Sequence, residues 1–313
     1  GESPRSLERI DKMTADKLGM QLFPEGTILF AKSGMSCMTG NVYVLKEPCY
    51  VVSHLACVAI DNTELTLYLK HYFRWNKPNA LVENPSFPSI RLGKIKDMEI
   101  RLPDARQIAR WVSTLERIEG LMETHEHQLS LLDDLVKSRF VEMFGDPTNG
   151  VAWPSKRLDE ICTIVTGNTP PRKDPSNYGD YIEWCKTDNI TDAKYLSTAS
   201  EMLSEEGALR GRVVPAGSIL MACIAGSVKS IGKVAVADRS VAFNQQINAL
   251  IPSEMIDVEY LLWALRLSKD YLCSGVNMQL KGILNKTSLS AKSFCVPPLA
   301  LQQQFAAFAA EVD

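Results

Sequence analysis

The 313-residue sequence has no Cys-x-x-Cys pair, no apolar run of the roughly 18 residues that a membrane span needs, and no basic excess. Its eight cysteines are scattered without a histidine at ligand spacing, which favours reduced core thiols over a zinc site. The net charge of −3 gives no support to a nucleic-acid site, so such a site would have to depend on local patches. Residues 1–4 do not have the pattern of a signal peptide. We therefore expect a cytoplasmic protein with no metal and no membrane segment.

What is present is an ordinary globular composition, 45% hydrophobic and 23% charged, which is enough for two domains. Between them, residues 103–147 predict one long helix, because apolar residues recur in steps of three and four. This apolar face, called the seam below, comprises Ile108, Val112, Leu115, Ile118, Met122, Leu129, Leu132, Val136 and Phe140. A helix from residue 104 to residue 144 would be roughly 60 Å long at about 1.5 Å per residue. The pattern predicts a spacer that forms a coiled coil with another helix.

The segments on either side of this helix form an internal repeat. In the first half we expect strands at residues 27–31, 41–45, 50–60 and 98–102, and helices at 7–18 and 65–75. In the second half we expect strands at 161–165 and 182–186 and helices at 257–268 and 299–312. Residues 217–221 match residues 26–30, and the Cys-Val-Pro-Pro segment at 295–298 matches residues 100–103. The predicted class is α+β. The domains are expected at 1–102 and 148–297, the spacer helix at 103–147, and the start of a second spacer helix at 298–313.

Three short motifs accompany the repeat: Gly167-x-Thr169-Pro170 early in the second domain, Pro297-Pro298-Leu299 followed by glutamines up to Gln304, and Met-Phe-Gly-Asp-Pro at 143–147. In this order the chain resembles the specificity subunit of type I restriction-modification systems. The resemblance implies two target-recognition domains, each reading half of a split double-stranded DNA target, with antiparallel helices that fix the gap. It also implies a non-catalytic subunit that recruits a methyltransferase subunit and, through it, a restriction subunit. S-adenosylmethionine, Mg²⁺ and ATP would belong to those partners.

Compared with that plan, we expect the first domain to lack its opening segment and the second helix to be cut after a few turns. We therefore expect the seam to be exposed over several turns, and large apolar stripes are rarely left in water. The prediction is self-association through the spacer helix, or pairing with another subunit. His125 continues the seam, where a packed histidine is favoured over a ligand.

Loop residues that carry ammonium, amide or hydroxyl groups are the candidates for DNA contact, because these groups bind phosphates and base edges. In the first domain they are Lys32, Ser33, Ser36, Lys77 and Asn79. In the second they are Lys173, Lys186, Ser227, Lys229, Ser230, Lys233, Asn277, Gln279 and Lys281. For the Asn-Gln-Gln segment at 244–246, the sequence favours structural hydrogen bonding and DNA contact equally.

Two other functions compete with DNA reading. A protein-interaction scaffold would use the apolar helix as its main binding surface. A free-standing DNA methyltransferase would use the Asn-Pro-Ser-Phe segment at 84–87, which superficially resembles the Asn-Pro-Pro-Phe/Tyr signature of amino-group DNA methyltransferases. The second proline of that signature is absent, and neither a glycine-rich strand-turn-helix nor a P-loop accompanies it. The sequence thus favours a binding protein over an enzyme.

Overall fold

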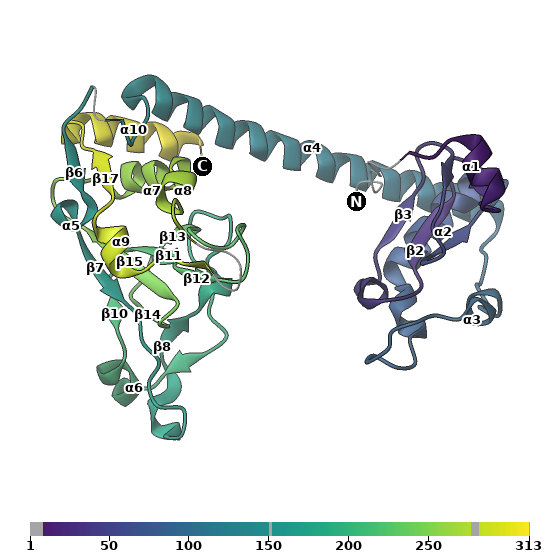
Figure 1. The fold of residues 1–313 in the computed structure, drawn as a ribbon, viewed down its shortest axis with the longest axis horizontal. Helices are drawn as coiled ribbons and strands as arrows, with labels where there is room; N and C mark the ends of the chain where they lie inside the picture. The colour runs from purple at the N-terminus through teal and green to yellow at the C-terminus, as the bar shows by residue number, and fades with distance from the viewer. Residues whose placement is uncertain (1–8, 150–151, 277–281, 313) are drawn as a thin grey trace. The chain divides into compact units, whose positions relative to one another are not determined.

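The structure is a computed structural model that describes residues 9–149, 152–276 and 282–312. The chain divides into two compact units, Gly1–His127 and Gln128–Asp313, called unit 1 and unit 2 below. Each combines helices with small sheets, so the predicted α+β class is confirmed. The forty-residue helix α4 (Ala105–Phe144) runs from unit 1 into unit 2 (Figure 1). No helix among the described residues is long and apolar enough to cross a bilayer.

Unit 1 is built around a three-stranded antiparallel sheet of order β3-β2-β5, with a separate β1-β4 pair. Before α4 its elements are α1 (Lys12–Lys17), β1 (Leu22–Phe23), β2 (Ile28–Ala31), η1 (Met35–Thr39), β3 (Val42–Val44), β4 (Cys49–Tyr50), β5 (Leu55–Val58), α2 (Thr63–Trp75), η2 (Pro78–Leu81) and α3 (Leu92–Lys96). Asn62 caps α2 by accepting a hydrogen bond from the Leu65 amide. The buried ring of Phe30 on β2 then packs on Phe73 of α2, with centroids 5.5 Å apart. The predicted strands near 27–31 and 41–45 and the helix near 65–75 are confirmed.

Unit 2 contains two four-stranded sheets, β13-β11-β15-β7 and β10-β14-β8-β9. Its elements after α4 are β6 (Ser155–Arg157), α5 (Leu158–Ile161), β7 (Cys162–Thr166), η3 (Pro175–Asn177), β8 (Tyr178–Cys185), η4 (Thr187–Asn189), β9 (Met202–Leu203), α6 (Glu205–Arg210), β10 (Val213–Val214), β11 (Ile219–Ala222), β12 (Ile224–Ala225), β13 (Val234–Val236), β14 (Val241–Phe243), β15 (Ile247–Pro252), α7 (Val258–Leu267), α8 (Lys269–Leu272), β16 (Gly282–Ile283), α9 (Lys286–Ser290), β17 (Ser293–Cys295) and α10 (Leu299–Val312). The strand predicted at 182–186 is longer than expected, because it begins at Tyr178.

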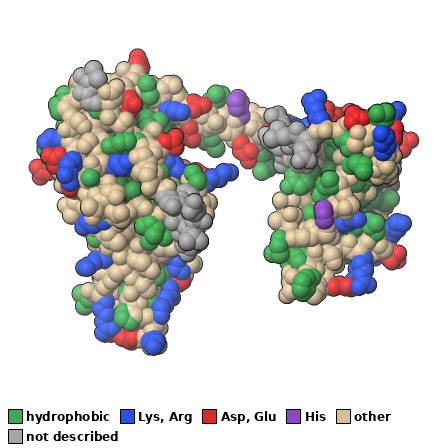
Figure 2. Space-filling view, viewed as in Figure 1, with side chains coloured by type: hydrophobic (Ala, Val, Ile, Leu, Met, Phe, Trp, Pro, Cys, Tyr) green, Lys and Arg blue, Asp and Glu red, His purple; other side chains and the backbone are tan. Residues whose placement is uncertain are grey.

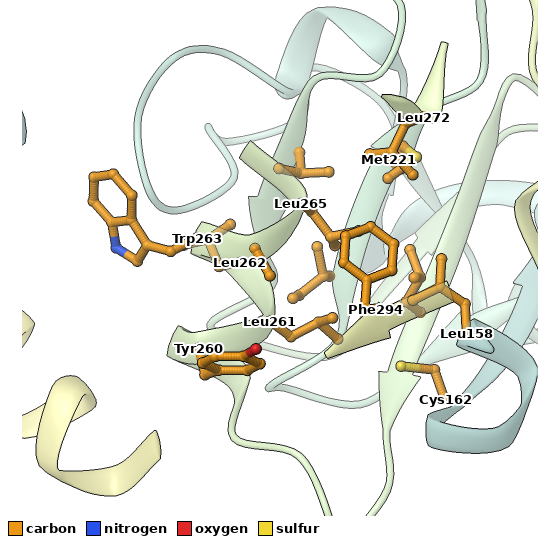
Figure 3. Close-up of a cluster of buried hydrophobic side chains, with 14 of the residues drawn as sticks. Leu158, Cys162, Met221, Tyr260, Leu261, Leu262, Trp263, Leu265, Leu272 and Phe294 are labelled. Carbon is orange, nitrogen blue, oxygen red and sulfur yellow. The ribbon is translucent and has the colours of Figure 1, made fainter. Parts of the chain in front are cut away.

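The largest hydrophobic cluster of unit 2 among the described residues includes side chains of α7 and of the sheet that contains β11. Figure 3 shows Leu261 and Leu265 of α7 directed towards Phe294, while the side chain of Trp263, also buried, extends from another side of α7. Asp257 caps α7 by accepting hydrogen bonds from the amides of Glu259 and Tyr260. The all-round apolar sequence of α7 matches its position, because a helix covered on most sides has few positions for polar residues.

The repeat predicted from the sequence extends to individual hydrogen bonds. The Thr27 hydroxyl donates to the Pro24 carbonyl at 2.7 Å, and the Ser218 hydroxyl donates to the Pro215 carbonyl at the same distance. In unit 1, β2 lies between β3 and β5 and is followed by α2. In unit 2, β11 lies between β13 and β15 and is followed by α7. The β1-β4 pair likewise has its counterpart in β10-β14. The two units therefore share one sheet-and-helix framework.

The strand predicted at residues 98–102 is absent, and this prediction was wrong. The counterpart in unit 2, β17, pairs with β6. In the described part of unit 1 no strand lies in the position of β6, so residues 98–102 have no edge with which to pair. Met98 and Ile100 instead pack against the core of unit 1 as irregular chain, after the short helix α3.

The seam of α4 is buried at its two ends and exposed in its middle. Ile108 and Val112 are buried in unit 1, and Val136 and Phe140 are buried in unit 2. Between them the apolar side chains are 37% to 64% exposed: Leu115, Ile118, Met122, Leu129 and Leu132. The predicted exposure of the seam is confirmed for this middle stretch, whereas its ends are core residues of the two units.

Candidate nucleic-acid interface

The five candidate residues of unit 1 lie on loops that the fold brings together. The η1 turn, which carries Ser36, contacts the η2 turn, which carries Asn79. The Asn79 side-chain amide donates to the Met38 carbonyl at 3.0 Å, so Asn79 has a structural partner. A Cβ added to Gly40 would lie 2.8 Å from Asn79 and 2.9 Å from the Cβ of Lys77, which leaves room only for glycine. Lys77 and Ser36 remain exposed on this surface.

Lys32 and Ser33 adjoin the same surface through the end of β2. The Lys32 amide donates to the His54 carbonyl at 2.9 Å, and the Ser33 hydroxyl lies 2.8 Å from His54 Nδ1. Ser33 also pairs with Ser89 in an isolated bridge. Loops from four parts of the chain thus meet at one end of the unit 1 sheet, and the exposed His54 joins the candidates that the sequence had singled out.

In unit 2 the Gly-x-Thr-Pro motif holds a loop against the end of β14. A Cβ on Gly167 would lie 2.2 Å from the Asn244 carbonyl oxygen, so only glycine permits this approach. The Thr169 hydroxyl donates to the side-chain oxygen of Gln245, an exposed residue. Asn244 itself is buried and accepts a hydrogen bond from the Gln246 amide at 3.0 Å. Within the segment 244–246, Asn244 therefore has the structural role, and Gln245 faces the surface.

Beyond this loop, Arg172 forms a cluster that the sequence did not indicate. Its guanidinium lies over the rings of Tyr178 and Trp184, 4.8 Å and 4.9 Å from their centroids. It also pairs with Glu201 at 2.7 Å, and Lys186 bonds to the same carboxylate. The hydrogen bond from Lys186, the larger cause, and the one from Arg172 lower the pKa of Glu201. The Glu201 carboxylate therefore binds both cations. The only sequence signal was the Arg-Lys pair at 172–173, because the aromatic partners are brought in by β8.

The surface of unit 2 around α6 and one end of β8 is mixed in charge rather than basic. Figure 2 shows Lys and Arg side chains around α6 and the lower end of β8 with acidic side chains among them. Arg210, for example, pairs with Asp174 at 2.7 Å and with Glu206 at 2.6 Å. Lys173 is exposed and has no ion pair among the residues that the structure describes. Paired, pre-oriented cations of this kind suit selective contacts better than general attraction to phosphate.

The loop at residues 226–233 also presents its predicted residues at the surface. The hydroxyls of Ser227 and Ser230 lie 2.9 Å apart. Lys233 is paired with Asp192 at 2.7 Å, while Lys229 is exposed. The candidates Asn277, Gln279 and Lys281 lie outside the described residues.

One group of side chains in unit 1 has the composition of a metal site. His71, Glu116 and Glu119 offer ligand atoms within 4.8 Å of one another. The ammonium of the buried Lys70 lies 2.5 Å from Glu116 and 2.9 Å from Glu119, and Arg74 pairs with Glu119 as well. Burial opposes ionisation here, but hydrogen bonds from Lys70 help to lower the pKa of both carboxyls. Because two cations already neutralise the carboxylates, the group acts as an ion-pair network that fastens α4 to α2.

The Asn-Pro-Ser-Phe segment forms a tight exposed turn. The Asn84 side-chain oxygen accepts from the Ser86 amide at 3.0 Å, and the Phe87 amide donates to the Asn84 carbonyl at 3.2 Å. Phe87 is 80% exposed. An amide that holds its own turn is accounted for by local structure.

Comparison with known proteins gives a consistent result. A family model described as the type I restriction modification DNA specificity domain matches residues 9–131 and 150–313. The HindI specificity subunit of a type I restriction enzyme from Haemophilus influenzae is 28% identical over 164 residues, which cover 49% of this chain and 34% of that protein. The MjaIX specificity subunit from Methanocaldococcus jannaschii is 27% identical over 190 residues, covering 54% and 43%. The chain thus spans less than half the length of these curated relatives.

A solved structure of a type I restriction-modification system S subunit from M. genitalium has a similar fold. Its TM-score is 0.54 at 13% identity, and the match covers 93% of this chain and 77% of that one.

Proposed function

The chain belongs to the family of type I restriction modification DNA specificity domains, and on that premise we propose that it reads DNA sequence within a type I restriction-modification complex. Each unit contacts one half of a split target in double-stranded DNA, and α4 sets the gap between the halves. In this proposal the chain is a non-catalytic subunit in the cytoplasm, where the DNA is.

The observation that carries the proposal is the repeated framework of the two units. The same strands and helix recur in each. A polar loop follows the central strand in both units, at residues 32–36 directly after β2 and at residues 226–233 after β11 and the short strand β12. Two copies of one framework, each with its own loop chemistry, suit two different half-sites. Arg172 and Gln245 add to unit 2 a pair of side chains suited to guanine and adenine edges.

The exposed middle of the seam is the surface we assign to protein partners. A stripe that includes Leu115, Ile118, Met122 and Leu129 is rarely left in water. It pairs with a second helix, from another copy of this chain or from another subunit. The methyltransferase subunit, and through it the restriction subunit, supplies the catalysis together with S-adenosylmethionine, Mg²⁺ and ATP.

The test is selection from a pool of randomised duplexes by the chain together with its methyltransferase subunit. We expect enrichment of two short conserved blocks separated by a fixed gap. Arg172→Ala should relax the preference in only one block, because the residue belongs to unit 2. Recovery of duplexes with no shared sequence would refute DNA reading and favour the scaffold alternative, in which the exposed helix is the main binding surface.

A further inference from the structure

A pocket in unit 2 joins part of the basic loop to residues that the sequence did not single out. Its volume is about 430 Å³. Four segments line it: Asp133, Asp134 and Lys137 from α4; Thr191 and Asp192 after η4; Lys229, Gly232, Lys233 and Val234 from the loop before and into β13; and Trp263, Arg266 and Lys269 from α7 and α8. All of them belong to unit 2, so one compact unit forms the whole pocket.

The pocket walls are fixed by hydrogen bonds. The Lys269 ammonium donates to the Lys229 carbonyl at 2.8 Å, which ties the loop to α8. Arg266 donates to the Ala193 carbonyl at 2.8 Å and lies over Trp263, 5.7 Å from the ring centroid. The side chain of Trp263 extends from another side of α7 than Leu261 and Leu265 (Figure 3), and it lines the pocket. These contacts hold the segment after η4 against α7.

Gly232 brings the loop close to α8. Its φ is +73°, and a Cβ there would lie 2.9 Å from the Cys273 sulfur. A side chain at this position would therefore be both strained and obstructed. The pocket depends on a backbone approach that only glycine allows.

The lining carries more positive than negative charge, with five basic and three acidic side chains. Lys233 is paired with Asp192 at 2.7 Å. That hydrogen bond, followed by the charges of Lys233, Arg266 and Lys269, lowers the pKa of Asp192, so its carboxylate lies in a positive field. In the part of the chain that the structure describes, the ammonium groups of Lys137 and Lys229 have no ion pair. Even if every carboxylate is matched by one cation, two cations remain.

We propose that this pocket binds a phosphate group of the DNA backbone, with Lys137 and Lys229 as its direct ligands. The inference rests on the proposed function and adds to it a sequence-independent anchor. Arg266, Lys233 and Lys269 position the walls. Because Lys137 belongs to α4, the anchor holds the last turns of this helix on the DNA together with the reading loops. It thereby fixes the position of the helix relative to the half-site that unit 2 reads.

The test removes the two direct ligands in the full chain, as Lys137→Gln with Lys229→Gln. The matched control is Lys156→Gln with Lys286→Gln, which removes equal charge from unit 2 outside the pocket. Binding of the chain, together with its methyltransferase subunit, to a labelled mixed-sequence duplex is measured over a series of salt concentrations. Each phosphate contact contributes roughly 0.9 to the slope of log affinity against log salt. Because the pocket binds one phosphate group, we expect the slope of the pocket variant to become shallower by about one and that of the control to stay within roughly a quarter of a unit of the wild type.

A second measurement separates backbone phosphate from free phosphate. The indole N–H signal of Trp263 is followed by NMR during titration with inorganic phosphate, with chloride at matched ionic strength. A shift with phosphate that the pocket variant loses supports the site. If Trp263 shifts but the salt slopes of wild type and pocket variant agree, free phosphate is the ligand and the DNA assignment is overturned. If the wild type binds duplex and neither measurement responds to the variant, the pocket proposal alone fails. If the wild type binds no duplex, the proposed function fails as well.

Discussion

The ring of Phe140 in α4 stacks on the ring of Tyr260 in α7, with centroids 5.3 Å apart and planes inclined by 22°. Both side chains are fully buried, and Phe140 also meets Phe305 of α10 edge-on at 5.2 Å. The last turns of the long helix are therefore part of the core of unit 2. A helix fastened in this way transmits its orientation to the domain at its end.

Truncation of Phe140 tests this connection. Phe140→Ala should destabilise unit 2 by about 3–5 kcal/mol, because it leaves a cavity among aromatic rings. The change in the free energy of unfolding is measured by chemical denaturation, with hydrogen exchange in α7 as the probe of unit 2. The control Leu129→Ala removes an apolar side chain that is 64% exposed on the same helix, and it should change stability by less than about 0.5 kcal/mol. Equal effects of the two substitutions would contradict the assignment of Phe140 to the core.

Gly167→Ala tests the close approach behind the Gly-x-Thr-Pro motif. The added methyl would lie 2.2 Å from a backbone oxygen, which cannot move aside as a flexible side chain can. We expect destabilisation of roughly 1–3 kcal/mol or more by thermal unfolding. Gly226→Ala is the control, because a Cβ there meets nothing within 4 Å. A Gly167 variant as stable as the Gly226 variant would show that the loop relaxes freely.

The ion-pair network of unit 1 predicts a pH dependence. The pKa values of Glu116 and Glu119 are lowered in the folded chain, so their contribution is present above the unfolded pKa of about 4.3 and lost as pH falls through the folded values. Hydrogen exchange in α2 should therefore accelerate as pH is lowered from about 5 towards 3, after correction for the intrinsic exchange rate. In the double variant Glu116→Gln and Glu119→Gln, protection should be lower at neutral pH and vary less with acid. Glu99→Gln, outside the network, should behave like the wild type.

The exposed seam predicts association through α4. Sedimentation velocity should show self-association that increases with concentration, and the double variant Ile118→Glu and Leu129→Glu should be monomeric. Ser113→Glu with Ser130→Glu adds the same charge at exposed polar positions of the helix and should leave association unchanged. A wild-type chain that stays monomeric at high concentration would count against pairing of copies and leave another subunit as the partner of the seam.

Periodicity predicted the elements that depend on local pattern. The helix ending at Phe144, the helix ending at Trp75 and the strand ending at Ala31 were all correctly placed, because apolar spacing and capping residues are encoded locally. The strand expected at residues 98–102 failed for a nonlocal reason, since a strand needs a partner edge and none lies there in the described part of unit 1.

The candidate site was predicted less completely. Loop chemistry pointed to Lys229 and Lys77, but it gave no sign that Asn79 holds the η1 turn or that Lys186 is bound by Glu201. Arg172 and Lys137 were not among the predicted residues. The guanidinium of Arg172 is oriented by aromatic rings on β8, and Lys137 lines the pocket because α4 lies beside the loop that carries Lys229.

By itself, the sequence determined the duplication, the long helix and the family, because repeats, periodicity and motif order depend only on the order of residues along the chain. The tertiary structure decided which seam residues are core and which are exposed, and which cations are already paired. It also decided which cations converge on a pocket. Burial, ion pairing and convergence depend on distances between segments far apart in the chain, and only folding sets those distances.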